Sequence, residues 1–153
     1  MVSIMSDDQY MSQALELARV AGENGEIPVG AVLLAEDGMV VAGSGNRSIA
    51  TSDPSGHAEI CVLREAGTKL GNYRLPGATL YVTLEPCPMC AGALVQARIA
   101  RIIFGATDPK MGACGSAFNL VDSDSLNHRI DVRQGPLAKE CGDLLKNFFA
   151  ERR

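Results

Sequence analysis

The sequence lacks the features that direct a chain into or across a membrane. No stretch approaches the roughly 20 consecutive apolar residues that a membrane-spanning helix needs. Residues 1–10 carry Asp7 and Asp8 in place of the basic and then apolar segment of a secretory leader. Internal repeats and low-complexity linkers are absent as well. We therefore expect one domain, residues 1–153, in a cytoplasmic protein without membrane attachment.

The sequence also lacks an excess of basic residues. Its 153 residues carry a net charge of −4, whereas nucleic-acid-binding domains are commonly basic. The charge is uneven, with a net −6 in residues 1–90 and +2 in residues 91–153. Any contacts with phosphates are therefore expected from the later part, where the candidates are Arg129, Arg133, Lys146, Arg152 and Arg153.

Cysteine is present in an odd number, five, and because a secretory pattern is lacking we expect no disulfide framework. Two of the five stand in the run Pro86-Cys87-Pro88-Met89-Cys90, and His57-Ala58-Glu59 precedes it in the chain. Zinc binds thiolate sulfur and imidazole nitrogen tetrahedrally, and catalytic zinc sites keep three protein ligands so that water can occupy the fourth position. His57, Cys87 and Cys90 match that number, so we predict one Zn²⁺ per subunit.

Glu59 is the carboxylate that this set of ligands leaves free. Zinc lowers the pKa of its bound water to about 7, which makes an attacking hydroxide available at neutral pH and requires a group that takes up the proton. Glu59 is placed for that role, and we predict that it is the catalytic acid and base of a hydrolytic reaction.

Local structure supports this grouping. Residues 87–97 and 57–69 have helical patterns, and Cys87 and Cys90, three residues apart, share a helix face. A helix N-terminus also favours thiolate over thiol. His57 and Glu59 are two residues apart and do not share a face, so we expect both to act from the first turn, where side chains tilt toward the N-terminal end.

Two structural alternatives remain at this point. In the first, the cysteines form a structural clip or are merely buried thiols. In the second, they bind zinc but the chain is a non-catalytic, zinc-stabilised binding module. A fourth protein ligand would favour that interpretation, and the candidates are Cys61, Cys114 and Cys141. A closed shell would leave Glu59 without a function, so we favour three ligands.

Hydrophobic periodicity predicts alternating helices and strands. Ser6 and Gln9 form a capping box at the start of a helix that ends near Gly25. We predict strands at 28–35, 39–43, 79–83, 101–104 and 130–132, and further helices at 57–69, 87–97 and 136–152, the last with Phe148 and Phe149 on its apolar side. The fold class is α/β: a three-layer α/β/α arrangement with a mixed five-stranded sheet and helices on both faces. Ligands in such sheets lie beyond the carboxyl ends of strands, which is where Glu85 and Pro86 lead into the cysteines.

These residues also carry a resemblance. His-x-Glu followed by Pro-Cys-x-x-Cys is the signature of the zinc nucleobase deaminases, and the whole chain resembles the bacterial tRNA adenosine deaminases, which have a cytidine deaminase-like fold. Departures from that family are Ser55-Gly56 beside the predicted zinc histidine, and Cys114. The similar stretches span nearly the whole chain and include 27–31, 45–47, 53–59, 72–75, 80–92, 96–99, 104–106, 126–129 and 148–149.

The resemblance implies hydrolytic deamination of the wobble adenosine of a tRNA anticodon to inosine, with release of ammonia. It further implies a homodimer that binds the tRNA anticodon stem-loop. Because deaminases of guanine and cytosine share the zinc motif, a free-base or nucleoside deaminase is the alternative. Substrate-binding positions carried over by the resemblance are Asn46, whose amide can contact a purine edge, Asp108, Asn127, Ala58, Val29, Glu85 and Pro86, and phosphate contacts are expected at Arg129, Arg152 and Arg153.

Overall fold

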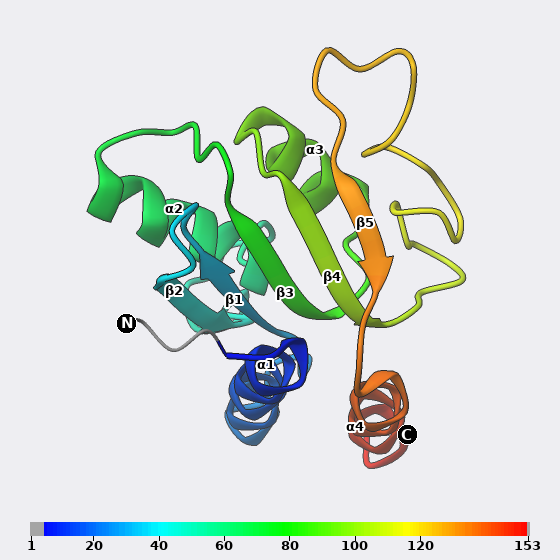
Figure 1. Ribbon diagram of the computed structural model, residues 1–153. Coiled ribbons are helices and arrows are strands. Elements are labelled where there is room, and N and C mark those ends of the chain that lie inside the picture. Colours follow the sequence, from blue (N-terminus) through cyan, green and yellow to red (C-terminus); the bar gives the residue numbers. More distant parts are fainter. Residues whose placement is uncertain (1–4, 153) are drawn as a thin grey trace.

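The computed structural model describes residues 5–152, in which helices and strands alternate (Figure 1). The first helix leads into a β-hairpin, and two strand-helix-strand connections follow before the C-terminal helix. In chain order the elements are α1 (Asp7–Glu23), β1 (Gly30–Leu34), β2 (Val40–Gly45), α2 (Ala58–Leu70), β3 (Thr79–Leu84), α3 (Pro88–Gln96), β4 (Arg101–Ala106), β5 (Asp131–Gln134) and α4 (Ala138–Ala150).

The five strands form one mixed sheet in the order β2-β1-β3-β4-β5. β1 pairs with β2 and with β3 in antiparallel orientation, and Ala31 lies opposite Val82. β3, β4 and β5 run parallel, with Leu80 opposite Ile102. The predicted mixed five-stranded sheet is confirmed.

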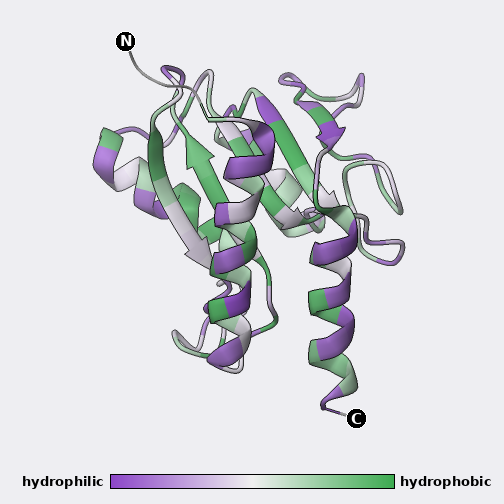
Figure 2. Ribbon diagram, turned by 60° about the horizontal axis from the view of Figure 1, so that its bottom comes forward, coloured by the Kyte–Doolittle hydropathy of each residue, from purple (hydrophilic) through white to green (hydrophobic). Residues whose placement is uncertain are grey.

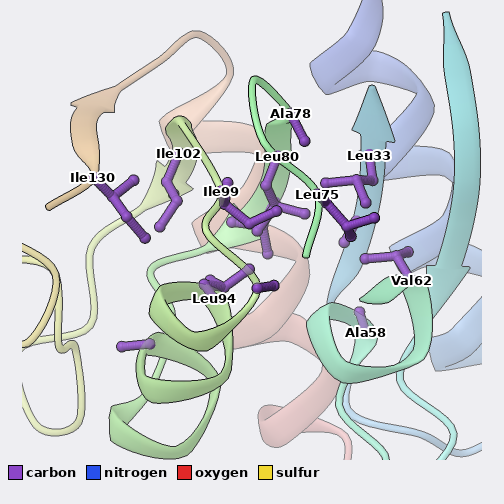
Figure 3. Packing of buried hydrophobic residues seen from close by; sticks show 14 of the residues in the cluster. Leu33, Ala58, Val62, Leu75, Ala78, Leu80, Leu94, Ile99, Ile102 and Ile130 are labelled. Atoms are coloured by element: carbon purple, nitrogen blue, oxygen red, sulfur yellow. The ribbon is translucent and has the colours of Figure 1, made fainter. Parts of the chain in front are cut away.

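Helices cover both faces of this sheet, as predicted. α2 and α3 pack on one face, where the larger core lies between Val62 and Leu94 of the helices and Leu80 and Ile102 of the strands (Figure 3). α1 and α4 cover the other face (Figure 2). The central strands are therefore buried on both sides, and β1 is buried along its whole length.

The capping box at the start of α1 is confirmed. The backbone N–H of Gln9 donates to the Ser6 hydroxyl, and the Ser6 N–H donates to the Gln9 side chain. The C-terminal helix begins later than predicted because Leu137 takes a left-handed conformation (φ 64°) and acts as its N-cap. Phe149 was expected on the apolar side of this helix, and that expectation is wrong: the residue is 44% exposed, whereas Phe148 is buried.

The topology brings two helix N-termini to one end of the sheet. α3 begins directly after β3 ends, and α2 packs beside α3 on the same face. Parallel β3 and β4 both point their carboxyl ends here, which is where ligands of such sheets bind. In residues 5–152, no helix is both long and apolar enough to cross a bilayer.

Candidate active site

His57 and Cys87 hold equivalent positions at the two helix N-termini. Each is the N-cap residue, with extended backbone at φ −69° and −76°, and neither side chain makes a capping hydrogen bond. N-cap side chains usually bind the free amides of the first turn, so these two are left available for another partner. The helices begin one residue later than predicted, and this explains how His57 and Glu59, two residues apart, can face one site.

The three predicted metal ligands lie together. One ligand atom from each of His57, Cys87 and Cys90 falls within 4.8 Å of the other two. Nδ1 of His57 is 3.6 Å from the Cys87 sulfur and 3.4 Å from the Cys90 sulfur. A tetrahedral zinc ion with Zn–S of about 2.3 Å and Zn–N of about 2.0–2.1 Å would place sulfur and nitrogen about 3.6 Å apart. The donor types and their spacing therefore fit a single zinc ion.

The two cysteines differ in how readily they ionise. The pKa of Cys87 is lowered to about 5, chiefly by a hydrogen bond with Cys90, and His57 contributes. The pKa of Cys90 is raised, chiefly because it is the partner in that hydrogen bond and because it is buried. The hydrogen bond between the two sulfurs thus favours ionisation of Cys87 over that of Cys90, and a metal ion bound by both sulfurs would displace the proton that they share.

Glu59 is a buried carboxyl group beside these ligands and is not one of the three. It is 4% exposed, and burial raises its pKa from an ordinary 4.5 to about 7, with a further contribution from the nearby Cys87. A carboxyl with a pKa near neutrality can both accept and donate a proton at physiological pH. These properties are those required of the predicted acid and base.

Comparison with the other buried glutamates sets Glu59 apart. Glu26 accepts hydrogen bonds from the backbone amides of Ile49 and Ala50, at 3.0 and 2.8 Å. Glu85 accepts backbone hydrogen bonds from three residues of another loop. Glu59 instead contacts its own backbone N–H and the Cys90 thiol. Two of the three carboxylates therefore hold loops in place, and Glu59 remains for chemistry.

Asn46 lies directly against the start of α2. Its Oδ1 accepts a hydrogen bond of 2.7 Å from the backbone N–H of Ala58, and so it caps the helix in place of His57. Ala58 and Val29 are buried around this point, and the N–H of Asn46 donates to the carbonyl of Val29 at 3.0 Å. These three positions, all predicted to bind substrate, are thus held together by hydrogen bonds.

Glu85, Pro86 and Asp108 meet on the other side of the site. Glu85 is 2% exposed and binds the backbone N–H of Asp108 at 3.1 Å. The carbonyl of Pro86 accepts a hydrogen bond from Ala113 at 2.8 Å. The Asp108 carboxylate accepts hydrogen bonds from the amides of Lys110 and Met111. The carboxylates of Glu85 and Asp108 are therefore both engaged within the protein.

The remaining residues predicted to contact RNA are exposed wherever the structure describes them. Asn127 is exposed in the loop before β5. Arg129 is held in ion pairs with Asp122 and Asp124, at 2.7 and 3.1 Å. Arg152 stacks on the Phe148 ring, 3.5 Å from its centroid. Arg153 lies outside the described residues, and Arg133 and Lys146 are exposed.

The remaining cysteines do not join the metal group within the described part of the chain. Cys61 contacts the carbonyl of Gly56 at 3.7 Å. Burial raises the pKa of Cys114 to about 12 and that of Cys141 to about 11, so both are thiols at neutral pH. The structure therefore brings together three candidate ligands from residues 5–152, as the sequence predicted.

Three positions that make long-range hydrogen bonds had no signal in the sequence: the buried Glu26 and Thr83, and the exposed Ser116. Glu26 and Ser116 were not predicted to belong to the site, and the hydroxyl of Thr83 accepts a hydrogen bond from the Gly30 N–H at 3.1 Å. Their partners are 23 to 53 residues away along the chain. Glu85 was predicted, but as a substrate contact. Long-range hydrogen bonds of this kind leave no periodic pattern that a sequence could reveal.

The fold and the site together define a deaminase. The sequence model of the MafB19-like deaminase family matches residues 5–153, so this chain belongs to that family.

Individual relatives narrow the comparison. The tRNA-specific adenosine deaminase of Haemophilus influenzae is 50% identical over 96% of this chain and 85% of its own length. A solved structure described in work on A-to-I editing by tRNA:A34 deaminases at the wobble position of transfer RNA has a TM-score of 0.86 and 48% identity. It covers 90% of this chain and 99% of that one. Guanine deaminase from Bacillus subtilis gives a TM-score of 0.65 and 31% identity, covering 97% and 94%. The chain is thus more similar to these tRNA deaminases than to this free-base deaminase.

Proposed function

We propose that this protein is a zinc-dependent tRNA adenosine deaminase that converts the wobble adenosine of an anticodon to inosine and releases ammonia. The observation that carries the proposal is the meeting of His57, Cys87 and Cys90 beside the buried Glu59. Similarity at 50% identity to a tRNA-specific adenosine deaminase supports the substrate. The alternative of a non-catalytic binding module is disfavoured because Glu59 is buried beside the three candidate ligands without being one of them.

His57 Nδ1 and the sulfurs of Cys87 and Cys90 would hold the zinc ion. Bound there, zinc would supply the Lewis acid that makes water a nucleophile at neutral pH. The N-terminus of α3, where both cysteines lie, supports the thiolates that would hold it, because a helix N-terminus favours negative charge.

Glu59 then moves the protons of the reaction. Its carboxylate takes a proton from the attacking water and delivers it to N1 of the adenine ring as the C6–O bond forms. The second proton of the water reaches the exocyclic nitrogen through the same carboxyl group, the C6–N bond breaks, and ammonia leaves. Water and adenosine are consumed, and inosine and ammonia are formed. A pKa near 7 suits a group that must act in both directions.

Asn46 would orient the base. Its carbonyl oxygen is already bound to the amide of Ala58, so the side-chain NH₂ is the group that remains to donate to a ring nitrogen of the purine. With this oxygen engaged, we expect Asn46 to contact the purine edge as a hydrogen-bond donor. Val29, buried beside it, would provide apolar contact.

Phosphates would be bound by arginines at the periphery, and we include Arg129, Arg152 and Arg153 in the proposal. Arg129 is paired with Asp122 and Asp124, whose side chains are 55% and 97% exposed. Surface ion pairs of this kind contribute only about 0–1 kcal/mol, so Arg129 can exchange them for phosphate at small cost.

A homodimer in the cytoplasm completes the proposal. The side of the molecule formed by α2 and α3 carries a groove lined by Leu63, Tyr73, Ala93 and Ala97, and Met89 on α3 is 40% exposed. Such apolar surface is suited to a second copy of the chain. Light scattering on the purified protein measures the mass directly, and a monomer at micromolar concentration would contradict this part of the proposal.

The substrate assignment is tested by incubating the purified zinc protein with an anticodon stem-loop that has adenosine at the wobble position, and separately with free adenosine, guanine and cytosine. We expect inosine in the stem-loop and no turnover of the small substrates. Turnover of a free base or nucleoside at a comparable rate would favour the alternative deaminase. A Glu59→Gln protein with the same zinc content is the matched control and should form no inosine above background.

A further inference from the structure

Glu85 lies where the segment leading to Cys87 meets the loop Asp108–Ser116, which we call the anchored loop. Oε1 of Glu85 accepts hydrogen bonds from the Asp108 N–H at 3.1 Å and from the Ser116 hydroxyl. Oε2 accepts from the N–H groups of Cys114 and Ser116, at 3.0 and 3.1 Å. One carboxylate thus gathers both ends of the anchored loop.

The loop closes tightly around this carboxylate. A Cβ atom at Gly112 would lie 2.4 Å from the carboxyl carbon of Glu85 and 2.5 Å from the carbonyl oxygen of Asp108. No side chain other than hydrogen fits there, so Gly112 allows the backbone to pass directly over the acid. Glu85 is 2% exposed, and the loop amides replace the water that a buried charge would otherwise need.

Backbone hydrogen bonds add to this connection. The N–H of Glu85 donates to the carbonyl of Ala106 at 2.9 Å, and the N–H of Ala113 donates to that of Pro86 at 2.8 Å. Cys87 is the next residue in the chain after Pro86. The anchored loop and the segment that carries a candidate metal ligand are therefore fixed relative to each other, and the Glu85 carboxylate supplies most of the bonds.

We propose that Glu85 is a positioning residue, not a substrate contact: it sets the anchored loop, and Asp108 with it, against the segment that holds Cys87, and thereby determines the affinity for the RNA substrate. All of its carboxylate hydrogen bonds go to the loop, which leaves it no free edge for a nucleotide. The proposal rests on the proposed function in taking the anchored loop as part of the RNA-binding side.

Glu85→Gln tests this directly, because it keeps the shape and replaces one acceptor oxygen by an NH₂ donor that must face N–H or O–H donors of the loop. We expect the amides of Asp108, Cys114 and Ser116 to exchange hydrogen at least about tenfold faster than in the wild type. Hydrogen bonds to a charged acceptor are stronger than those to a neutral one. Their loss should loosen the anchored loop, and KM for the stem-loop should therefore rise about tenfold. The zinc content should be unchanged and kcat should stay within about threefold.

Two further variants make the result specific. Cys141→Ala removes a sulfur from the core on the opposite face of the sheet, and it should lower the unfolding temperature without changing KM. Ser116→Ala removes one donor at an exposed position and leaves the fold in place; it should raise KM by about twofold to threefold, in the same direction as Glu85→Gln.

The exchange measurement decides whether the carboxylate anchors the loop, and it does not require activity. Wild-type exchange rates at the three amides in Glu85→Gln would overturn the proposal. So would faster exchange with an unchanged KM, or a fall in kcat that follows loss of zinc. A wild-type protein that is inactive on the stem-loop would instead contradict the proposed function, while the exchange rates would still test the anchor.

Discussion

Replacing Glu59 by glutamine should abolish activity and at the same time stabilise the zinc-free protein at alkaline pH. Glu59 is 4% exposed, and burial raises the pKa of its carboxyl group from 4.5 to about 7. A carboxyl whose pKa is raised on folding destabilises the native state once it is ionised. The free energy of unfolding therefore falls as the pH rises from about 4.5 to about 7, and the loss amounts to about 3 kcal/mol above that range.

Glutamine has nearly the same shape and never ionises, so Glu59→Gln avoids this loss. Urea unfolding of the chelator-treated proteins, followed by circular dichroism, measures the difference. At pH 8 the variant should be about 3 kcal/mol more stable than the wild type, and at pH 4.5 the two should agree within about 0.5 kcal/mol. Glu26→Gln is the control: its carboxylate accepts two backbone amides, so this variant should be less stable at both pH values. A Glu59→Gln protein that is no more stable than the wild type at pH 8 would refute the reasoning.

Other predictions follow from the site and its surroundings. Cys87→Ser should lose zinc on dialysis against a chelator, because a hydroxyl is a poor substitute for the thiolate; zinc content equal to the wild type would contradict the ligand assignment. Asn46→Ala removes the hydrogen bond to the Ala58 amide and should lower the free energy of unfolding by about 1 kcal/mol, as loss of a helix cap does, and raise KM; thermal unfolding and kinetics that match the wild type would show that Asn46 has neither role. Binding of the stem-loop should weaken as salt rises from 50 to 200 mM in a titration, with a log-log slope near −0.7 per phosphate neutralised, and a flat response would argue against the arginine contacts.

Much of this arrangement could be predicted from the sequence because its signals are local. The strand and helix patterns gave the mixed sheet with helices on both faces, and Ser6 with Gln9 gave the start of α1. The His-x-Glu and Pro-Cys-x-x-Cys motifs each lie within one turn of a helix start, and the ligand preference of zinc was enough to group His57 with Cys87 and Cys90.

What could not be predicted depends on contacts between distant segments or on the local conformation of loops. The engagement of Glu85 with Cys114 and Ser116 joins residues 29 and 31 positions apart, and Arg129 is paired with aspartates of its own loop. The start of α4 depends on the left-handed backbone of Leu137, an unusual conformation for a residue other than glycine. Composition and periodicity carry no information on such features.

X-ray absorption spectroscopy of the zinc-loaded protein tests the central claim most directly, because it counts the ligands around the metal. The account predicts two sulfur neighbours at about 2.3 Å and two nitrogen or oxygen neighbours at about 2.0–2.1 Å, of which one is imidazole and the other exchangeable with solvent. Three sulfur neighbours, or a fourth ligand that comes from a side chain, would contradict it.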